Sequence, residues 1–505
     1  MNVGAVVTTV GRVFRRRPAD LLPFYLLGAA VPLFGQVIGI AGITLIAVYL
    51  EVTGRLETAL SAAGDIGPPP EVEPEDDPDE LLEWLEGFEP IFEALVSPVT
   101  TTILLGSVLL AVGVVVFVSA IMTAGQLGTC FARLKDRRGL TSGIGAARRF
   151  WPAMLTLYLL ELFAHVVLLG LVFVVVSLAA AAAGPAGAVL GVLFAGGLWL
   201  ILALVLRAIF AFAPVAVVVD EVGSFESLSN AAGFIVRNPA EALVYYVAAI
   251  AAIVGVAIAG TVLAVVGAQP IVGLVSPLII LPLLDLLKTG FYADHRDGLL
   301  ERPPIEASYR QQFRAGTRRG YRELTDFVRA YAHFHAFSLA VILVGFVIGW
   351  LAADRIVDLV DTSIEARLEG QIAPGAALGY FGNNWLVALT TAFSGVALAI
   401  PTIGVLWFNG VVFGLYGRTE VDPEILAAFV LPHGIFEIPA IIVAGAVGVF
   451  LGRAWFQTAL GRADREAFAD ALERAFWVLV GVGILMAIAA IIEGFLSPYY
   501  FRPLL

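Results

Sequence analysis

The chain has 505 residues, of which 59% are apolar and 14% are charged, and its formal net charge is −12. This composition excludes a soluble globular domain and predicts a polytopic, all-α transmembrane bundle. A single cysteine, Cys130, excludes an intramolecular disulfide and cysteine-rich zinc motifs. Because acidic residues are abundant and lysine occurs only at Lys135 and Lys288, the composition is typical of a halophile, such as a halophilic archaeon.

The first predicted span runs from Leu21 to Leu50, which is long enough to cross about 30 Å of hydrocarbon. It follows a cluster of arginines and lacks a cleavage site, so we expect a retained helix with the N-terminus inside. No lysine or arginine lies between Arg55 and Arg133. Carboxylates crowd this segment, among them Asp65, Glu71, Glu73, Glu75, Asp76, Asp77, Asp79, Glu80, Glu83 and Glu86. We predict a solvated acidic loop outside, part helical around Leu81 to Leu95, rather than a calcium site, because EF-hand spacing is missing.

Five further spans are predicted in this half of the chain. They run from Val99 to Gly128, from near Pro152 to a turn within Ala179 to Gly187, from that turn to near Pro214, from Ala240 to Val266, and from near Ile271 to Gly290. The segment Asp220 to Asn238 predicts an amphipathic helix on the inner surface. An arginine close to a proline recurs at Pro18, Pro152 and Pro239, where proline suits a first helical turn, so we expect three helical hairpins.

The densest charge lies between Asp294 and Arg329, next to Pro303 and Pro304. We therefore predict a six-helix domain over residues 1–300, a basic inner linker over residues 301–332 and a five-helix domain over residues 333–505. The linker is either a patch for anionic lipids or partners, or a segment that only fixes topology. Its arginines are Arg302, Arg310, Arg314, Arg318, Arg319, Arg322 and Arg329.

The C-terminal half predicts five spans. They are Phe337 to Leu351, Phe381 to Ile400, a run from Pro401 to near Tyr416, a run from Pro432 to Arg453, and Phe476 to Leu496. We interpret Pro401 as a tight inner turn; the alternative is one bent span from Asn384 to Tyr416, which would put the later arginines outside. With the tight turn the chain has about 11 spans, in a 6 + 5 arrangement, and its C-terminus lies outside.

Two ionisable residues interrupt an apolar run near the start of the fourth of these spans. His433 and Glu437 are four residues apart, so they share one helix face. An ionisable side chain near the bilayer centre costs about 2.5–3.5 kcal/mol, which favours a functional site, although the pair could instead bond each other as packing contacts. The predicted topology brings further polar residues to the same outer depth, with one amide deeper. The candidate polar site is Asn383, Asn384, Asn409, His433, Glu437 and Glu493.

This half resembles the family of stage II sporulation protein M. The likeness is carried by Phe381-Gly382-Asn383-Asn384, the Gly395 to Pro401 segment, Asn409-Gly410 with Gly414, Pro432-His433-Gly434-Ile435-Phe436-Glu437-Ile438-Pro439-Ala440 with Gly445 and Gly448, and Glu493-Gly494-Phe495. The resemblance implies a five-helix bundle and, in spore formers, an anchor or organiser within the complex that remodels peptidoglycan during engulfment. A halophilic archaeon would lack that process.

The N-terminal half is loosely similar to the membrane domain of some glycerophosphodiester phosphodiesterases. The similarity is carried by Ala213-Pro214-Val215 and by the segment from Asp220 through Gly223, Phe225, Glu226, Ser227 and Leu228. It implies a membrane scaffold only, because the catalytic domain of that family is absent.

These observations favour a non-catalytic scaffold or organiser in the plasma membrane, with membrane lipids and other membrane or envelope proteins as partners. We expect no cofactor, no metal and no nucleic-acid partner, and the sequence leaves the oligomeric state open. A transporter is the first alternative, because glycine-rich and proline-broken helices can line a pathway. An intramembrane metal-dependent hydrolase is the second, with His433, Glu437 and Glu493 as ligands, although no His-Glu-x-x-His motif occurs.

Overall fold

The computed structural model describes residues 2–67, 78–299, 302–357, 360–368 and 370–500. Within these residues the chain forms helices, and its only β-type pairing is an isolated bridge between Thr362 and Glu420. The prediction of an all-α membrane bundle is confirmed.

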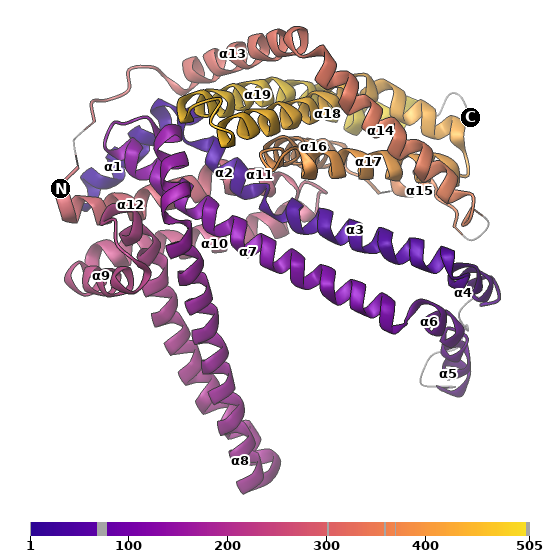
Figure 1. The fold of residues 1–505 in the computed structure, drawn as a ribbon, viewed down its shortest axis with the longest axis horizontal. Coiled ribbons are helices and arrows are strands. Elements are labelled where there is room, and N and C mark those ends of the chain that lie inside the picture. Colours follow the sequence, from indigo (N-terminus) through magenta and orange to yellow (C-terminus); the bar gives the residue numbers. More distant parts are fainter. Residues whose placement is uncertain (1, 68–77, 300–301, 358–359, 369, 501–505) are drawn as a thin grey trace.

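The helices follow one another in two groups (Figure 1). The N-terminal group is α1 (Val3–Arg16), η1 (Pro18–Asp20), α2 (Leu22–Ala29), α3 (Val31–Val52), α4 (Arg55–Gly64), α5 (Pro78–Glu86), α6 (Glu89–Leu95), α7 (Pro98–Leu134), α8 (Gly139–Val219), α9 (Ser224–Arg237), α10 (Pro239–Ala264), α11 (Ile271–Val275), η2 (Ser276–Ile280) and α12 (Leu281–Asp297). The C-terminal group is α13 (Tyr309–Ala330), α14 (Ala332–Ala353), α15 (Ile364–Leu368), α16 (Ala373–Ser394), α17 (Ile400–Thr419), α18 (Pro423–Ala459), α19 (Arg465–Phe495) and α20 (Ser497–Tyr500).

In the described chain, nine helices are long and apolar enough to cross a membrane. α8 counts once among them, although its 81 residues contain a break at Ala183 and Gly184. The chain reverses there into two arms that lie side by side, with Arg207 of the second arm 3.0 Å from Glu161 of the first (Figure 1). α16, which has 22 residues, is not among the nine. The count of about 11 spans and their inside–outside orientation stay predictions.

Two large apolar cores hold most of the helices together. One lies within the N-terminal group and includes Phe212 and Phe234. The other joins the two groups, because Phe24 of α2 and Leu140 of α8 pack in the same cluster as Leu479 of α19. A shared core therefore links the two predicted domains across the basic linker.

The arms of α8 project away from the remaining helices (Figure 1). Their outer surface is apolar: Phe173 and Phe194, on either side of the reversal, are 73% and 75% exposed. Lipid tails are as apolar as leucine side chains, so such a surface needs no protein partner in a bilayer.

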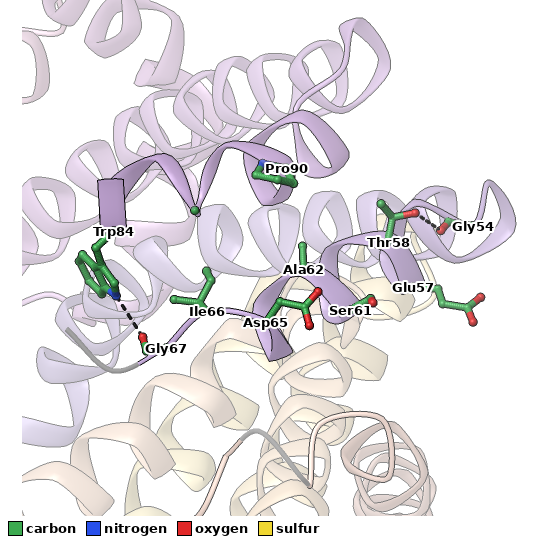
Figure 2. A pocket seen from close by; sticks show the side chains of 11 residues that line it. Gly54, Glu57, Thr58, Ser61, Ala62, Asp65, Ile66, Gly67, Trp84 and Pro90 are labelled. Atoms are coloured by element: carbon green, nitrogen blue, oxygen red, sulfur yellow. Dashed lines mark hydrogen bonds between the residues drawn. The ribbon is translucent and has the colours of Figure 1, made fainter. Parts of the chain in front are cut away.

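α4, α5 and α6 form a small helical cap at the far ends of α3 and α7 (Figure 1). α5 and α6 occupy most of the stretch predicted to be helical, and residues 68–77, with part of the acidic run, lie outside the described residues. A cavity of about 740 Å³ lies in this cap. Beside it the Trp84 indole nitrogen donates to the Gly67 carbonyl at 3.0 Å (Figure 2). Glu57 and Asp65 are the ionisable residues of its described lining.

α16 and α17 are two helices, as the tight-turn interpretation predicts. Between them Leu398 and Ala399 adopt positive φ angles of 55° and 62°, and the Thr402 hydroxyl donates to the Thr391 carbonyl at 2.7 Å across the turn. α16 runs in the same direction as α18, because Asn384 bonds Glu437 and Gly395 lies against Gly448. α17 runs in the opposite direction, because Thr402 lies against Gly448 and Leu406 against Gly445. The chain therefore reverses direction at the turn, and the bent-span alternative is wrong.

The last two long helices extend beyond their predicted apolar runs. α18 begins nine residues before Pro432, at Pro423, and α19 begins eleven residues before Phe476, at Arg465. Asp422 and Asp464 cap the two N-termini by accepting hydrogen bonds from backbone N–H groups three residues later, at 3.1 and 2.8 Å. Capping and amphipathic packing continue a helix past the hydrocarbon, where hydropathy alone gives no signal.

Glycines on both helices let α14 and α17 approach closely. A Cβ added to Gly349 would lie 2.0 Å from the Val411 carbonyl oxygen, and one added to Gly410 would lie 2.2 Å from the Ile342 carbonyl oxygen. Each helix carries its glycines four residues apart, which is the small-xxx-small pattern of close helix pairs in membranes. This contact fixes α17 against the rest of the C-terminal group.

We expect Gly349→Ala to destabilise the folded chain by about 1–3 kcal/mol, because the new methyl group would overlap the backbone of α17. The matched control is Gly255→Ala in α10, where a Cβ meets no heavy atom within 4 Å. The control should keep or slightly raise stability, since alanine is the better helix former by about 1 kcal/mol. Thermal unfolding in detergent measures both variants, and equal midpoints would contradict the close contact.

Candidate functional site

Two prolines bracket the turn of α18 that carries His433 and Glu437. Pro432 and Pro439 lie inside the helix, where each lacks the N–H that would bond the carbonyl four residues earlier. The helix continues through both positions, so the two ionisable side chains keep their common face. Nε2 of His433 lies 3.9 Å from Oε2 of Glu437.

Side chains from four helices meet at this turn in what we define as the polar cluster: Asn384, His433, Glu437, Glu493 and Ser497. Nδ2 of Asn384, on α16, donates to Oε1 of Glu437 at 2.9 Å. Nδ1 of His433 lies 3.2 Å from the hydroxyl oxygen of Ser497, on α20. One ligand atom from each of His433, Glu437 and Glu493 lies within 4.8 Å of the other two.

Three members of the polar cluster are buried, and Asn384 and Glu437 are partly buried. His433 is 6% exposed, Glu493 is 9% exposed and Ser497 is fully buried. Oε2 of Glu493 has no hydrogen-bond partner among the described residues. Two carboxylates this close in apolar surroundings repel each other when both are ionised, so a proton or a cation between them stabilises the arrangement. The cluster is chemically suited to hold either.

The structure brings together five of the six predicted site residues. Asn383 joins from the edge, because its Nδ2 donates to Oδ1 of Asn384 at 3.0 Å while its side chain stays exposed. Asn409 does not join: its Nδ2 donates at 2.8 Å to the carbonyl of Val405, one turn earlier in α17. Ser497 was not among the predicted residues, because a serine in an apolar tail gives no sequence signal.

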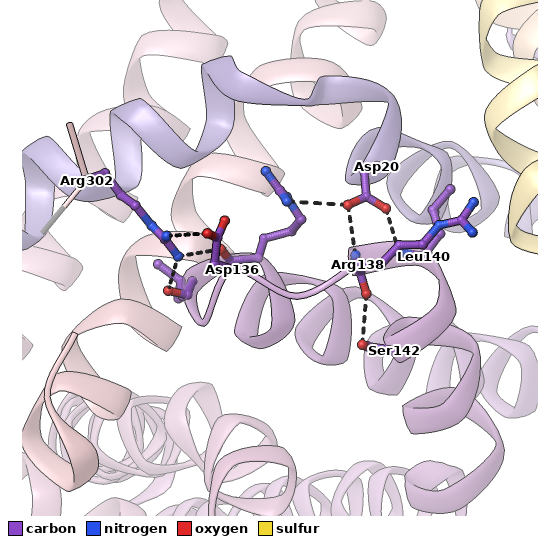
Figure 3. A network of polar contacts seen from close by, with 9 residues as sticks. Asp20, Asp136, Arg138, Leu140, Ser142 and Arg302 are labelled. Carbon is purple, nitrogen blue, oxygen red and sulfur yellow. Dashed lines mark hydrogen bonds and ion pairs between the residues drawn. The ribbon is translucent and has the colours of Figure 1, made fainter. Parts of the chain in front are cut away.

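A second buried network lies at the junction of α7 and α8 and is not predicted from the sequence (Figure 3). Asp20 accepts hydrogen bonds from the backbone N–H groups of Gly139 and Leu140 at 2.8 and 3.0 Å, and Arg133 lies 3.4 Å from the same carboxylate. Asp20 thereby satisfies the free N–H groups at the start of α8. Its place after Pro18 in the first Arg-Pro motif is the only sequence sign of this role.

The same network anchors the start of the basic linker. Arg302 is 6% exposed, lies 3.0 Å from Asp136 and donates to the Leu134 carbonyl at 2.9 Å (Figure 3). Arg302 therefore belongs to the interior and not to an exposed basic patch.

A third cluster lies in the N-terminal group, between α2, α7 and α12. Lys288 is 2.8 Å from Asp285, which accepts a hydrogen bond from the Tyr25 hydroxyl at 3.0 Å, and that hydroxyl is also 3.0 Å from the Cys130 sulfur. The criterion that selects His433 and Glu437, ionisable residues on one helix face within an apolar run, applies equally to Asp285 and Lys288.

The polar cluster lies in the part of the chain that is similar to known proteins. Residues 338–498 match the family model Stage II sporulation protein M. An uncharacterized protein of the archaeon Methanocaldococcus jannaschii is 22% identical over 168 residues, which cover 32% of this chain and 92% of that protein. No solved structure matches the chain at a significant level.

The match to Stage II sporulation protein M begins in α14 and takes in every member of the polar cluster. It confirms the resemblance predicted for the C-terminal half, and with the apolar helices it supports an integral membrane protein. These comparisons give no support to the glycerophosphodiester phosphodiesterase resemblance of the N-terminal half. The halophilic source and the plasma membrane stay predictions.

We expect Glu437→Leu to destabilise the bundle more than Glu437→Gln does. The glutamine keeps an oxygen that can accept from Asn384, whereas leucine leaves that partly buried amide without its partner, at a cost of about 1–3 kcal/mol. Thermal unfolding of the two purified variants in the same detergent gives the comparison. Equal stability would argue against a buried, hydrogen-bonded Glu437.

Proposed function

We propose that the chain is a non-catalytic scaffold of the plasma membrane, which binds anionic lipid headgroups at its inner face and gathers other membrane or envelope proteins there. The main support for this proposal is the structure of α13. This helix is fixed on the C-terminal bundle and exposes a row of arginines on its outer face. The similarity to Stage II sporulation protein M, a membrane family, is consistent with it.

One face of α13 is firmly attached to α19. Leu324 and Phe327 are buried, and a Cβ added to Gly320 would lie 3.0 Å from the backbone nitrogen of Gly481. Arg319 is 3.1 Å from Glu473, so this arginine serves the attachment. α13 is thus a fixed part of the bundle and more than a flexible linker.

The opposite face of α13 is basic and aromatic. Arg310, Arg314, Arg318 and Arg322 are exposed and recur every four residues, which places them in one row. None of the four forms an ion pair within the described chain. Tyr321, beside the row, is 59% exposed, and Phe313, in line with Gly320 but near the start of the helix, is 75% exposed. Arginines flanked by exposed aromatic side chains are typical of helices that bind a membrane interface.

The position of α13 along α19 supports contact with headgroups. α13 crosses α19 between Glu473 and Gly481, where Arg474 is the last charged residue before an apolar run that continues to Ile492. The Arg319 guanidinium lies 4.5 Å from the Trp477 ring, and tryptophan is enriched at this boundary of a bilayer.

A cavity of about 630 Å³ at the same level supports the proposal further. Its lining comes from α1, η1, α13 and α19, and from the residues that precede η1 and α8. Five of the lining residues are arginines and three are acidic: Arg15, Arg16, Arg17, Arg138, Arg319, Asp20, Asp470 and Glu473. The net positive lining suits a phosphate headgroup.

Replacing Arg310, Arg314, Arg318 and Arg322 together by glutamine should weaken binding of phosphatidylglycerol at least ~10-fold, since each arginine near an anionic surface contributes about 1 kcal/mol. Native mass spectrometry with added phosphatidylglycerol or phosphatidylcholine measures the bound lipid. The matched control replaces the same four residues by lysine, which keeps the charge and should keep most of the binding.

The fold of the glutamine variant should be unaffected, because the four side chains make no ion pair in the described chain. In native membranes the same variant should lose anionic lipids and a reproducible set of co-purifying proteins that the lysine variant retains. Identical lipid and protein retention in both variants would refute the proposal.

A further inference from the structure

We infer that His433, Glu437 and Glu493 bind a divalent transition-metal ion, of the zinc or manganese class, inside the C-terminal bundle. The three side chains come from two neighbouring helices and offer one imidazole nitrogen and two carboxylate oxygens within 4.8 Å of one another. Such a mixed nitrogen and oxygen set suits zinc, manganese or iron better than calcium or magnesium, which favour oxygen ligands throughout.

Each of two ligands has an outer partner that orients it. Nδ1 of His433 is 3.2 Å from the Ser497 oxygen, and in the tautomer that carries hydrogen on Nδ1 the Nε2 lone pair faces Glu437. Asn384 donates to Oε1 of Glu437 at 2.9 Å, which leaves Oε2 free on the side of His433. Metal sites in proteins commonly hold their imidazole and carboxylate ligands in this way.

Glu493 gives independent support for a bound cation. It is 9% exposed, and its Oε2 is buried without a hydrogen-bond partner in the described chain. A buried carboxylate oxygen without a partner costs free energy. A bound cation would offset this cost and would also neutralise the charge of Glu437. No positively charged side chain is paired with Glu437 or Glu493 among the described residues.

The distances fit an ion after small side-chain movements. Ligand atoms about 2.1 Å from a tetrahedral ion are about 3.4 Å apart. Nε2 of His433 and Oε2 of Glu437 are 3.9 Å apart, and the largest separation within the set does not exceed 4.8 Å. Rotation of the glutamate side chains closes these gaps without moving a helix. Three protein ligands leave a fourth position for water or another small ligand.

Metal analysis of the full chain tests the inference directly. We expect the protein, purified in mild detergent without added metal, to carry about one transition-metal ion per chain by plasma mass spectrometry. After chelation, added Zn²⁺ should restore the metal and raise the unfolding temperature, whereas added Mg²⁺ should not. Co²⁺ in place of Zn²⁺ should give visible absorption bands of a low-symmetry site.

Variants locate the ion. Glu493→Gln and His433→Gln should lose the bound metal, and Ser497→Ala should weaken Zn²⁺ affinity about 10–100-fold by removing an orienting partner. The matched control is Glu161→Gln in α8, which changes a partly buried glutamate that pairs with Arg207, outside the polar cluster. The control should retain the metal.

A folded wild-type chain that carries no transition metal and binds no added Zn²⁺ would overturn the inference, as would full metal retention in folded Glu493→Gln. If that variant fails to fold, chelation and reloading of the wild-type chain decide the matter. The lipid measurements on α13 do not involve this site, so the scaffold proposal and the metal inference succeed or fail separately.

Discussion

A polar side chain inside a bilayer needs a partner within the protein, because hydrocarbon offers none. This constraint explains the arrangement of the C-terminal bundle. α16, α18, α19 and α20 each contribute to one polar cluster, in which Asn384 bonds Glu437 and His433 contacts Ser497. The same constraint explains the Asp285–Lys288 pair in the N-terminal group, where the Tyr25 hydroxyl completes the contacts of the carboxylate.

Close packing of glycines makes these polar contacts possible. Hydrophobic burial gives little attraction between helices in lipid, so they associate through close van der Waals contact and hydrogen bonds. In the polar cluster's surroundings, a Cβ added to Gly494 would lie 2.8 Å from Ala377, and one added to Gly483 would lie 2.7 Å from the Trp385 ring. These contacts hold α16 against α19, so that Asn384 is near enough to reach Glu437 on α18. The arms of α8 make few such contacts and expose their apolar surface instead.

Much of the fold follows from hydropathy and charge in the sequence. Long apolar runs predict the helices, and the reversal of α8 falls inside the small-residue stretch expected to turn. Hydropathy does not predict the starts of α18 and α19, because Asp422 and Asp464 cap helical extensions that lie outside the apolar runs. The α16–α17 turn is predicted correctly from Pro401, since proline at the first helical turn marks a start.

The candidate site is predictable in part. His433, Glu437 and Glu493 stand out because ionisable residues in apolar helices are rare, and the alternating spans bring them to one end of the bundle. Asn409 is wrongly predicted to join the site, because its amide donates to the carbonyl of Val405 in its own helix. Ser497 and Asp20 are not predictable, since their roles depend on contacts between segments that are distant in sequence.

Polar side chains of separate helices depend on one another inside the bundle. A double-mutant cycle between Asn384 and Glu437 tests this dependence most directly, with Asn384→Ala, Glu437→Ala and the double variant unfolded reversibly in mixed micelles. We expect the two substitutions to be coupled by about 0.6–1.7 kcal/mol, the range found for hydrogen bonds between membrane helices. Strictly additive changes in the free energy of unfolding would contradict the account.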